Sequence, residues 1–239
     1  MVKRYKKDLD VSYTLGMTLT IELLKYKLEY VTRIFIHSKL IKNDAYLYIE
    51  EVCKKNKIPL IQNDKVFNIL AQKENCFVIG EFNKFKADVN KEKNHIVLVN
   101  PSNAGNLGTI IRTMVGFNLK DLVIISPAVD IYDPKCVRAS MGALFHLNFQ
   151  YFENFQDYTK EYDSRYYYPF MLQASRNLNE VKIKEPYSLI FGNEATGLDL
   201  KYLDYGQSVI IKHSENIDSL NLPIAVSIGI YEVTKEKFK

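Results

Sequence analysis

The chain has 239 residues, of which 47% are apolar and 25% charged, so it is long enough to bury one or two cores. No apolar run approaches the roughly 20 residues that a membrane span needs, and no apolar segment follows the basic start of the chain, so neither a span nor a signal peptide is expected. The three cysteines, Cys53, Cys76 and Cys136, are far apart in the sequence, so we expect reduced thiols in the cytoplasm. The four histidines lack metal-ligand spacing, so we expect no metal site.

The net charge of +4 is spread unevenly along the chain. Residues 1–92 carry 17 Lys and Arg against 12 Asp and Glu, a net charge of +5, and the remainder carries 15 against 16, a net charge of −1. A basic surface of this size is compatible with ordinary solvation and equally with binding of a polyanion such as RNA. Composition alone leaves both interpretations open.

The first part of the chain predicts a small module in which helices and strands alternate. Helices are expected from Thr20, as an N-cap, and over 46–56 and 64–70, and strands over 31–37, 59–61 and 76–80. A polar and charged stretch then suits a linker. We therefore assign residues 1–85 to a small α/β domain and 86–94 to a linker.

The second part predicts longer elements with continuous apolar strands, which are typical of a sheet covered on both faces. Expected strands lie at 96–99, 122–125, 147–150, 167–172, 187–191 and 209–212. Expected helices lie at 107–117, 134–145, 153–161 and 222–233. Because strands and helices alternate, residues 95–239 should form a parallel sheet between two helix layers.

Three segments place glycines and small polar residues where an apolar strand gives way to a helix. They are Asn103–Thr113, Phe191–Leu198 and Asp218–Pro223. None fits the nicotinamide fingerprint, the Walker loop or the hydrolase elbow. Helix capping explains each one alone, but all three follow strands, and the carboxyl ends of strands are where α/β sheets bind ligands. Arg112 lies off the apolar stripe of its helix, so it faces solvent or a site.

These segments also match a family motif by motif. The order Asn-Leu-Gly-Thr-Ile-Ile-Arg-Thr (106–113), Phe-Gly-Asn-Glu-Ala-Thr-Gly-Leu (191–198) and Ser-Leu-Asn (219–221) resembles the SpoU class of the SPOUT RNA methyltransferases. Val137–Ala143 is similar to the Arg-x-Ser-x-Gly-Ala stretch of that family. The resemblance is dense over 95–235, and residues 5–82 look like the small substrate-binding domain that precedes it in many members.

The resemblance implies a fold and a reaction. The fold is an α/β parallel sheet with helices on both faces and a C-terminal trefoil knot, an exception to unknotted topology, preceded by a small α/β domain like that of a ribosomal protein. The reaction is transfer of a methyl group from S-adenosylmethionine to a ribose 2′-hydroxyl in structured RNA. A homodimer is implied, packed through helices 107–117 and 222–233.

The family's functional residues can be carried over by position. The resemblance implies catalytic roles for Asn106, Arg112, Glu194, Ser219 and Asn221, and contacts with the cofactor by Gly192, Asn193, Gly197, Ile211 and Leu220. Because the pKa of an arginine exceeds about 12, we expect Arg112 to anchor an RNA phosphate and stabilise the forming alkoxide rather than act as a simple base.

One stretch departs from the family pattern. Where the family reads Ile-Pro-Met, a small residue and Gly, this chain has Ile211 followed by Lys212, His213, Ser214 and Glu215, which changes a loop that faces the cofactor. Ribosomal RNA is the preferred substrate. The alternatives are transfer RNA, a catalytically silent RNA-binding relative, and a knotted methyltransferase that modifies a base nitrogen.

Overall fold

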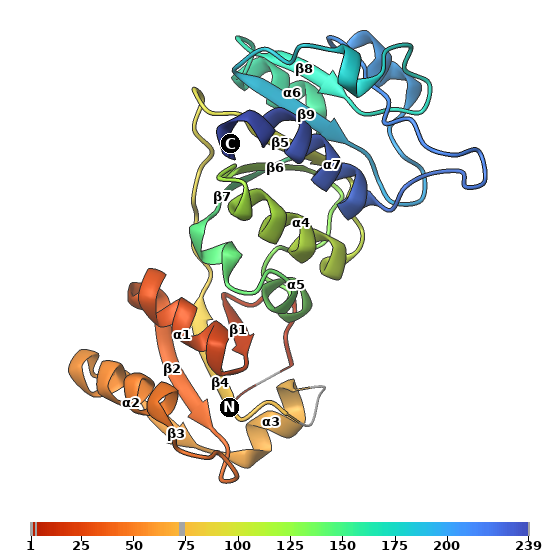
Figure 1. Cartoon of the computed structure of the whole chain (residues 1–239). Coiled ribbons are helices and arrows are strands. Elements are labelled where there is room, and N and C mark those ends of the chain that lie inside the picture. The colour runs from red at the N-terminus through yellow and green to blue at the C-terminus, as the bar shows by residue number, and fades with distance from the viewer. Residues whose placement is uncertain (1, 3, 72–74, 239) are drawn as a thin grey trace. The chain divides into compact units, whose positions relative to one another are not determined.

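The computed structural model describes residue 2, residues 4–71 and residues 75–238, which form two compact units (Figure 1). The first unit comprises Met1–Phe85 with Asp130–His146, and the second comprises Lys86–Val129 with Leu147–Lys239. This grouping differs from the predicted boundaries, because residues 130–146 pack in the first unit and residues 86–94 belong to the second.

The first unit contains a mixed sheet with the strand order β1-β4-β2-β3, in which β4 is antiparallel to β1 and β2 and β3 is parallel to β2. The strands are β1 (Val11–Leu15), β2 (Val31–Ile36), β3 (Leu60–Gln62) and β4 (Val78–Asn83). The helices are α1 (Met17–Tyr26), α2 (Asp44–Asn56) and α3 (Asp64–Leu70). Neighbouring strand residues alternate between the faces: Ile34 packs in the cluster of α1 and α2, and Phe35 packs in that of α3. A short 3-10 turn, Leu28–Tyr30, leads into β2.

Two features at the start of this unit differ from the prediction. Helix α1 begins after Gly16, so Thr20 lies inside the helix and is not its N-cap. The hydroxyl group of Thr20 donates to the Gly16 carbonyl (2.9 Å) and pairs with the Thr14 hydroxyl (2.8 Å). Strand β1 has no counterpart in the prediction because its buried Ser12 and Thr14 interrupt the apolar pattern; their hydroxyl groups bond to Tyr132 O and to the Gly80 N–H.

Residues 130–146 complete the first unit, although they connect two strands of the second. They form α5 (Pro134–Ala139) and a 3-10 turn, Ala143–His146. The predicted helix over 134–145 is therefore wrong in its second half. Met141 and Gly142 have φ values of +51° and +92°, which end the helix, and a side chain at Gly142 would lie 2.8 Å from Glu22.

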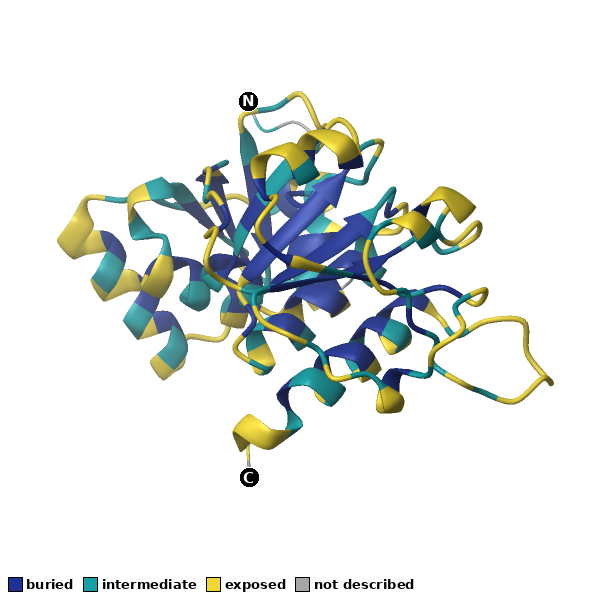
Figure 2. Ribbon diagram, turned by 90° about the horizontal axis from the view of Figure 1, so that it is seen from above, coloured by how far each residue is buried: buried dark blue, intermediate teal, exposed yellow. Residues whose placement is uncertain are grey.

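The second unit contains a five-stranded sheet with the order β7-β6-β5-β9-β8, and every strand pair is parallel. The strands are β5 (His95–Val99), β6 (Asp121–Ile125), β7 (Asn148–Phe152), β8 (Tyr166–Pro169) and β9 (Tyr187–Phe191). Helices cover both faces: α4 (Ala104–Gly116) and α7 (Leu222–Thr234) lie side by side, and α6 (Phe155–Glu161) packs on Val97 and Val123 from the other face. The predicted parallel sheet between helix layers is confirmed, and Figure 2 shows its strands as buried.

The predicted strand over 209–212 is wrong. Val209 and Ile210 form only isolated bridges, with Phe170 and Asn177, as the chain passes beyond the end of β8. Short 3-10 turns at Leu178–Glu180, Leu200–Asp204 (η4) and Lys235–Phe238 make up the remaining regular structure of the described residues.

At the start of β5, a buried histidine takes part in a polar network. Nδ1 of His95 is 2.9 Å from the Tyr158 hydroxyl, which lies 2.6 Å from the Ser188 hydroxyl, and Nε2 is 2.8 Å from the Asn90 carbonyl. Nearby, the guanidinium of Arg165 donates to the carbonyls of Lys93 and Tyr187. Burial, together with the positive charge of Arg165, lowers the pKa of His95 to about 3.

This lowered pKa predicts acid sensitivity of the second unit. The unfolded chain takes up a proton on His95 at a higher pH than the folded chain does. The contribution of neutral His95 to the stability of the folded chain is therefore complete above about pH 6.5 and is lost as the pH falls toward 3. Its contribution to the free energy of unfolding should fall by up to about 1.4 kcal/mol per pH unit in that window. Urea unfolding followed by circular dichroism at several pH values measures this slope.

The substitution His95→Gln should flatten the slope between pH 6.5 and 5, although it lowers stability at pH 7 because buried hydrogen bonds are lost. His213→Gln, in the same unit, is the control and should retain the wild-type slope. An unchanged slope in His95→Gln would assign the acid sensitivity to other groups.

Candidate active site

Three loops meet beyond the carboxyl ends of the strands of the parallel sheet. The first connects β5 to α4, the second follows β9 over residues 192–198, and the third leads into α7. The side chain of Asn103 caps α4 by accepting the N–H groups of Gly105 (2.8 Å) and Asn106 (3.1 Å). The helix therefore begins in a fixed position directly beside the second loop.

The carboxylate of Glu194 joins the first two loops. Oε2 accepts the N–H (3.0 Å) and the hydroxyl (2.9 Å) of Ser102, and Oε1 accepts the N–H of Asn103 (3.2 Å) and the side-chain amide of Asn106 (3.1 Å). Burial alone would raise the pKa of Glu194, but these hydrogen bonds from Ser102 and Asn106 and one from its own backbone outweigh burial and lower the pKa. Glu194 is therefore ionised at neutral pH.

The second loop is a tight turn that depends on two glycines. A side chain at Gly192 would lie 2.1 Å from the backbone carbon of Gly197, so no larger residue fits there, and Gly197 itself has φ +67°. Asn193 and Gly197 exchange two backbone hydrogen bonds. The side-chain amide of Asn193 donates to the Asn100 carbonyl (2.7 Å), and its oxygen accepts the N–H of Ala195 (2.8 Å). The turn is thus fixed to the end of β5.

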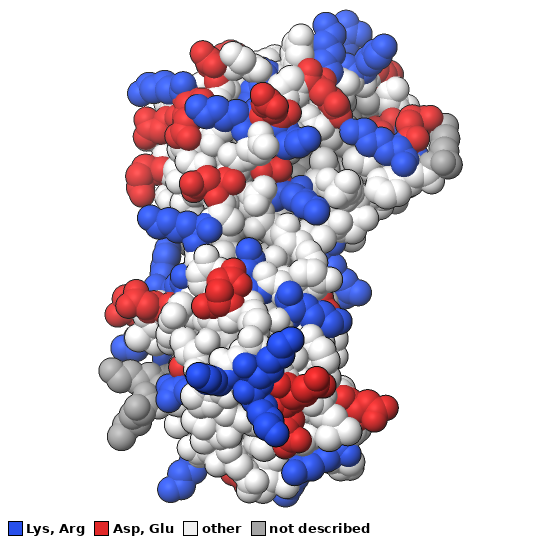
Figure 3. Space-filling model, turned by 90° about the vertical axis from the view of Figure 1, so that its left-hand side faces the viewer, with Lys and Arg blue, Asp and Glu red and all other residues white. Residues whose placement is uncertain are grey.

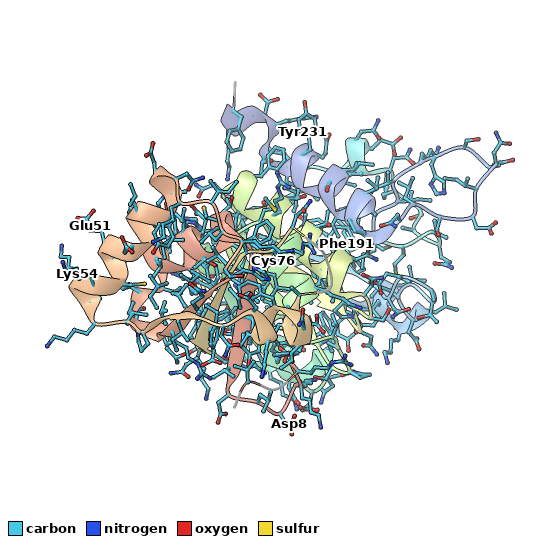
Figure 4. All side chains as sticks on the ribbon, turned by 90° about the horizontal axis from the view of Figure 1, so that it is seen from below. Asp8, Glu51, Lys54, Cys76, Phe191 and Tyr231 are labelled. Carbon is cyan, nitrogen blue, oxygen red and sulfur yellow. The ribbon has the colours of Figure 1, made fainter. Side chains whose placement is uncertain are left out.

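A cavity of about 320 Å³ lies against this turn. Its apolar walls include Phe170, Met171 and Leu172, and Phe170 stacks on Phe191 with ring centroids 4.3 Å apart. Phe191, labelled in Figure 4, lies at the end of β9 beside α7. Seven of the predicted site residues line this cavity: Gly192, Asn193, Glu194, Gly197, Ile211, Ser219 and Leu220.

The other three predicted residues lie outside the cavity wall. Asn106 is connected to it through its hydrogen bond to Glu194. Asn221 occupies the N-cap position of α7, but its side chain makes no capping hydrogen bond, so capping does not account for it. Arg112 is exposed on α4, and its side chain forms no hydrogen bond or ion pair with the described residues. Asn221 lies between Leu220 and Leu222, which both line the cavity, so a single chain brings nine of the ten residues to the cavity or its edge and leaves Arg112 apart.

The loop that departs from the family pattern contributes His213 to the cavity wall. Nδ1 of His213 is 3.0 Å from the Ile211 carbonyl, an acceptor, so this nitrogen carries the proton. Lys212, Ser214 and Glu215 are exposed. Asp218 also lines the cavity and adds a second carboxylate to its wall.

Sequence reasoning missed the groups that hold the glutamate. Ser102 and Asn103 supply three of the four hydrogen bonds to Glu194. Their position directly after an apolar strand, with Asn103 as a helix cap, was the available signal.

Within the described ranges, no cluster of three or more His, Cys, Asp or Glu could hold a metal ion, and none of the described helices is long and apolar enough to cross a membrane.

The substitution Gly192→Ala should displace the turn, because its Cβ would overlap the backbone at Gly197. We expect a lower melting temperature of the second unit and loss of ligand binding in the cavity, measured by thermal unfolding and by calorimetric titration. Gly116→Ala is the matched control: nothing lies within 4 Å of its Cβ, so this variant should be unchanged or stabilised by up to about 1 kcal/mol. Full binding by Gly192→Ala would show that the turn tolerates displacement.

The chain matches the model of the SpoU rRNA methylase family over residues 93–231. It is 28% identical over 146 residues to an uncharacterised tRNA/rRNA methyltransferase of Synechocystis sp., covering 60% of this chain and 53% of that protein. It is 29% identical over 132 residues to the 23S rRNA (guanosine(2553)-2′-O)-methyltransferase RlmP of Bacillus subtilis, covering 54% of this chain and 53% of that protein. The chain therefore spans about half the length of these relatives.

Among solved structures, the fold resembles an AdoMet-bound rRNA methyltransferase from Sinorhizobium meliloti, with a TM-score of 0.81 at 23% identity, covering 95% of this chain and 88% of that one. This likeness concerns the fold alone. The family model, in contrast, spans more than half of the sequence and includes all the loops of the site. The protein belongs to the SpoU rRNA methylase family.

Proposed function

We propose that the protein transfers a methyl group from S-adenosylmethionine to the 2′-hydroxyl of a ribose in structured RNA. The observation that carries this proposal is the cavity beside the 192–197 turn, which gathers seven of the residues expected from the family motifs. Ribosomal RNA is the preferred substrate, since the Bacillus relative is named for 23S rRNA. Transfer RNA is the alternative, since the Synechocystis relative is named for both.

The cavity suits the proposed cofactor in size and chemistry. Its volume of about 320 Å³ is within the range of small-ligand sites, and Phe170 and Met171 offer an apolar surface for a flat heterocycle. Backbone groups of Gly192, Ile211 and Leu220 would hold the cofactor. The carboxylates of Glu194 and Asp218 favour a cation, and the cofactor when bound supplies a methyl group on a positively charged sulfonium.

The chain's own residues position and activate the nucleophile in this proposal. Glu194 and Asn106 fix the two loops, and Ser219 and Asn221 offer a hydroxyl and an amide at the entrance to α7 for the ribose. Arg112 binds the neighbouring RNA phosphate and stabilises the alkoxide that forms as the 2′-hydroxyl passes its proton through that phosphate to solvent, while the methyl group leaves the sulfonium sulfur as a thioether. A guanidinium suits this role because it stays charged and binds phosphate with two parallel hydrogen bonds.

Because Arg112 does not line the cavity of its own chain, the proposal has a second copy of the chain supply it. Helix α7, packed beside α4, carries large exposed apolar residues: Ile224 is 52% exposed, Ile228 37% and Tyr231 56%. Figure 4 shows Tyr231 on the outer side of α7. Such a row of apolar side chains suits a homodimer packed through α4 and α7. The trefoil knot expected of the C-terminal segment forms part of this proposal.

The first unit would bind RNA. Lysines are exposed before α2 and at its C-terminal end: Lys39, Lys42, Lys54, Lys55 and Lys57. Figure 4 shows Lys54 extending from α2, and Figure 3 shows basic side chains gathered on this unit with acids beside them. Positive groups of this kind attract the phosphates of RNA without reading its sequence.

The proposal predicts separate effects on binding and on transfer. With the RNA substrate, Arg112→Ala should lower the rate of methyl transfer by about 10²-fold or more, because the alkoxide loses its stabilising charge. Titration calorimetry should still detect S-adenosylmethionine with unchanged affinity, since Arg112 does not line the cavity. Mass spectrometry of nuclease digests identifies the product, and Arg176→Ala, an exposed arginine of the same unit, is the control.

Several outcomes would contradict the proposal. Absence of cofactor binding by the wild-type protein would favour a silent RNA-binding relative, and methyl groups on bases would favour the nitrogen-modifying class. Mixed dimers of Arg112→Ala with Gly192→Ala should regain activity if one copy supplies the arginine and the other the cavity. Mapping 2′-O-methyl sites in total RNA with and without the protein separates ribosomal from transfer RNA.

The dimer can be tested by itself. Tyr231→Asp should place a charge in the apolar face of α7 and convert a dimer into a monomer, as measured by sedimentation velocity. Leu200→Asp is the matched control, because Leu200 is 61% exposed on η4, away from α4 and α7, and this variant should remain dimeric. A monomeric wild type would exclude the arrangement.

A further inference from the structure

A second and larger cavity opens beyond the carboxyl ends of the strands of the same sheet. Its volume is about 710 Å³, and its walls come from the loops that follow β5, β6 and β7. Phe155 and Tyr202, with ring centroids 5.0 Å apart, form part of its apolar floor. Because ligands of open α/β sheets bind outside the carboxyl ends of the strands, this cavity lies where a ligand is expected. Of the residues carried over from the family motifs, Asn193 and Gly197 line it, but neither was expected to form a second cavity.

The two cavities are separated by a single turn. Asn193, Thr196 and Gly197 line both, so the turn after β9 forms a shared wall. A ribose at the edge of this wall could present its 2′-hydroxyl toward the smaller cavity. Its base, attached at the neighbouring sugar carbon, would then enter the larger one.

The larger cavity offers hydrogen-bonding groups that the protein itself does not use. The side chains of Asn100, Glu153 and Thr196 line it, and they form no hydrogen bond with other described residues. An amide both donates and accepts, a carboxylate accepts, and a hydroxyl does either. Together they complement the edge of a nucleobase, which carries donors and acceptors side by side.

The charge of the cavity favours a base over a phosphate. Its charged lining residues among those described are Glu153, Asp199 and Lys201, which sum to a net charge of −1. A phosphate would meet this negative charge without an arginine to compensate it, whereas a neutral heterocycle would meet an apolar floor and a polar rim.

We propose that this cavity binds the base of the nucleotide whose ribose is methylated. The inference rests on the proposed methyl transfer and deepens it by assigning a substrate pocket next to the cofactor cavity. Enzymes that do chemistry on a base remove it from the base stack and hold it by hydrogen bonds and by contacts with apolar and aromatic side chains. A base whose own ribose reacts would be held by the same kinds of contact. Glu153, Asn100 and the floor of Phe155 and Tyr202 supply those contacts.

The probes are the neutral ribonucleosides cytidine, uridine and guanosine, added to the full-length protein saturated with S-adenosylhomocysteine. Saturating the smaller cavity first prevents a nucleoside from occupying it. Saturation-transfer NMR and titration give the affinities. We expect binding of at least one nucleoside and about tenfold weaker binding by Glu153→Gln, because an acceptor of two hydrogen bonds becomes an amide. Glu92→Gln, an exposed glutamate of the same unit outside both cavities, is the control.

Each outcome decides the inference. Nucleoside binding that is weakened in Glu153→Gln but not in Glu92→Gln, with equal affinity for S-adenosylhomocysteine in all three proteins, supports it. The inference is overturned if no nucleoside binds in the presence of saturating S-adenosylhomocysteine. It is also overturned if Glu153→Gln and Glu92→Gln bind the nucleoside equally well. A protein that does not bind S-adenosylhomocysteine at all would refute the proposed function itself, which is a different result.

Discussion

The site depends on the contact between Gly192 and Gly197. The two backbones approach so closely that only hydrogen atoms fit between them, and this allows the chain to reverse direction directly after β9. Asn193 then reaches the end of β5 and Glu194 reaches the start of α4. One tight turn therefore fixes the loops of two adjacent strands relative to each other and forms the wall between two cavities. A change of one methyl group at position 192 would disturb all of these contacts together.

Glu194 illustrates how a residue near a reaction centre can serve a structural purpose. Four of its hydrogen bonds come from the loop after β5 and the first turn of α4, and with one from its own backbone they stabilise its negative charge against the cost of burial. Its carboxylate oxygens are occupied, so it is poorly suited to take a proton from a substrate. Its charge still contributes to the electrostatic potential of the cavity, together with Asp218. Glu194 thus fixes the loops and contributes negative charge, while other side chains would contact the reacting atoms.

Much of the second unit could be predicted from the sequence, since Ile96–Val99 and Leu122–Ile125 are continuous apolar strands and α7 is almost wholly apolar. The failures have physical causes. Strand β1 was hidden because Ser12 and Thr14 are buried with satisfied hydroxyl groups, and the helix after Pro134 stops at a turn that side-chain patterns do not reveal. Motifs predicted most of the smaller cavity, because its residues lie in short segments. The larger cavity is lined by short runs such as Ile125–Val129 and Glu153–Gln156, which match none of the motifs, so the sequence did not mark it.

The segment between β6 and β7 has a consequence for biosynthesis. Phe145 packs against Phe82 and Tyr132 packs against Phe85, so the core of the first unit requires residues 130–146. A ribosome makes these residues only after it has made β5, α4 and β6. The first unit therefore cannot finish folding when its first 85 residues are complete, and its apolar surface stays uncovered while β5 and β6, two of the five strands of the second sheet, are being made. The two units are therefore not made one after the other, and their folding on the ribosome overlaps in time.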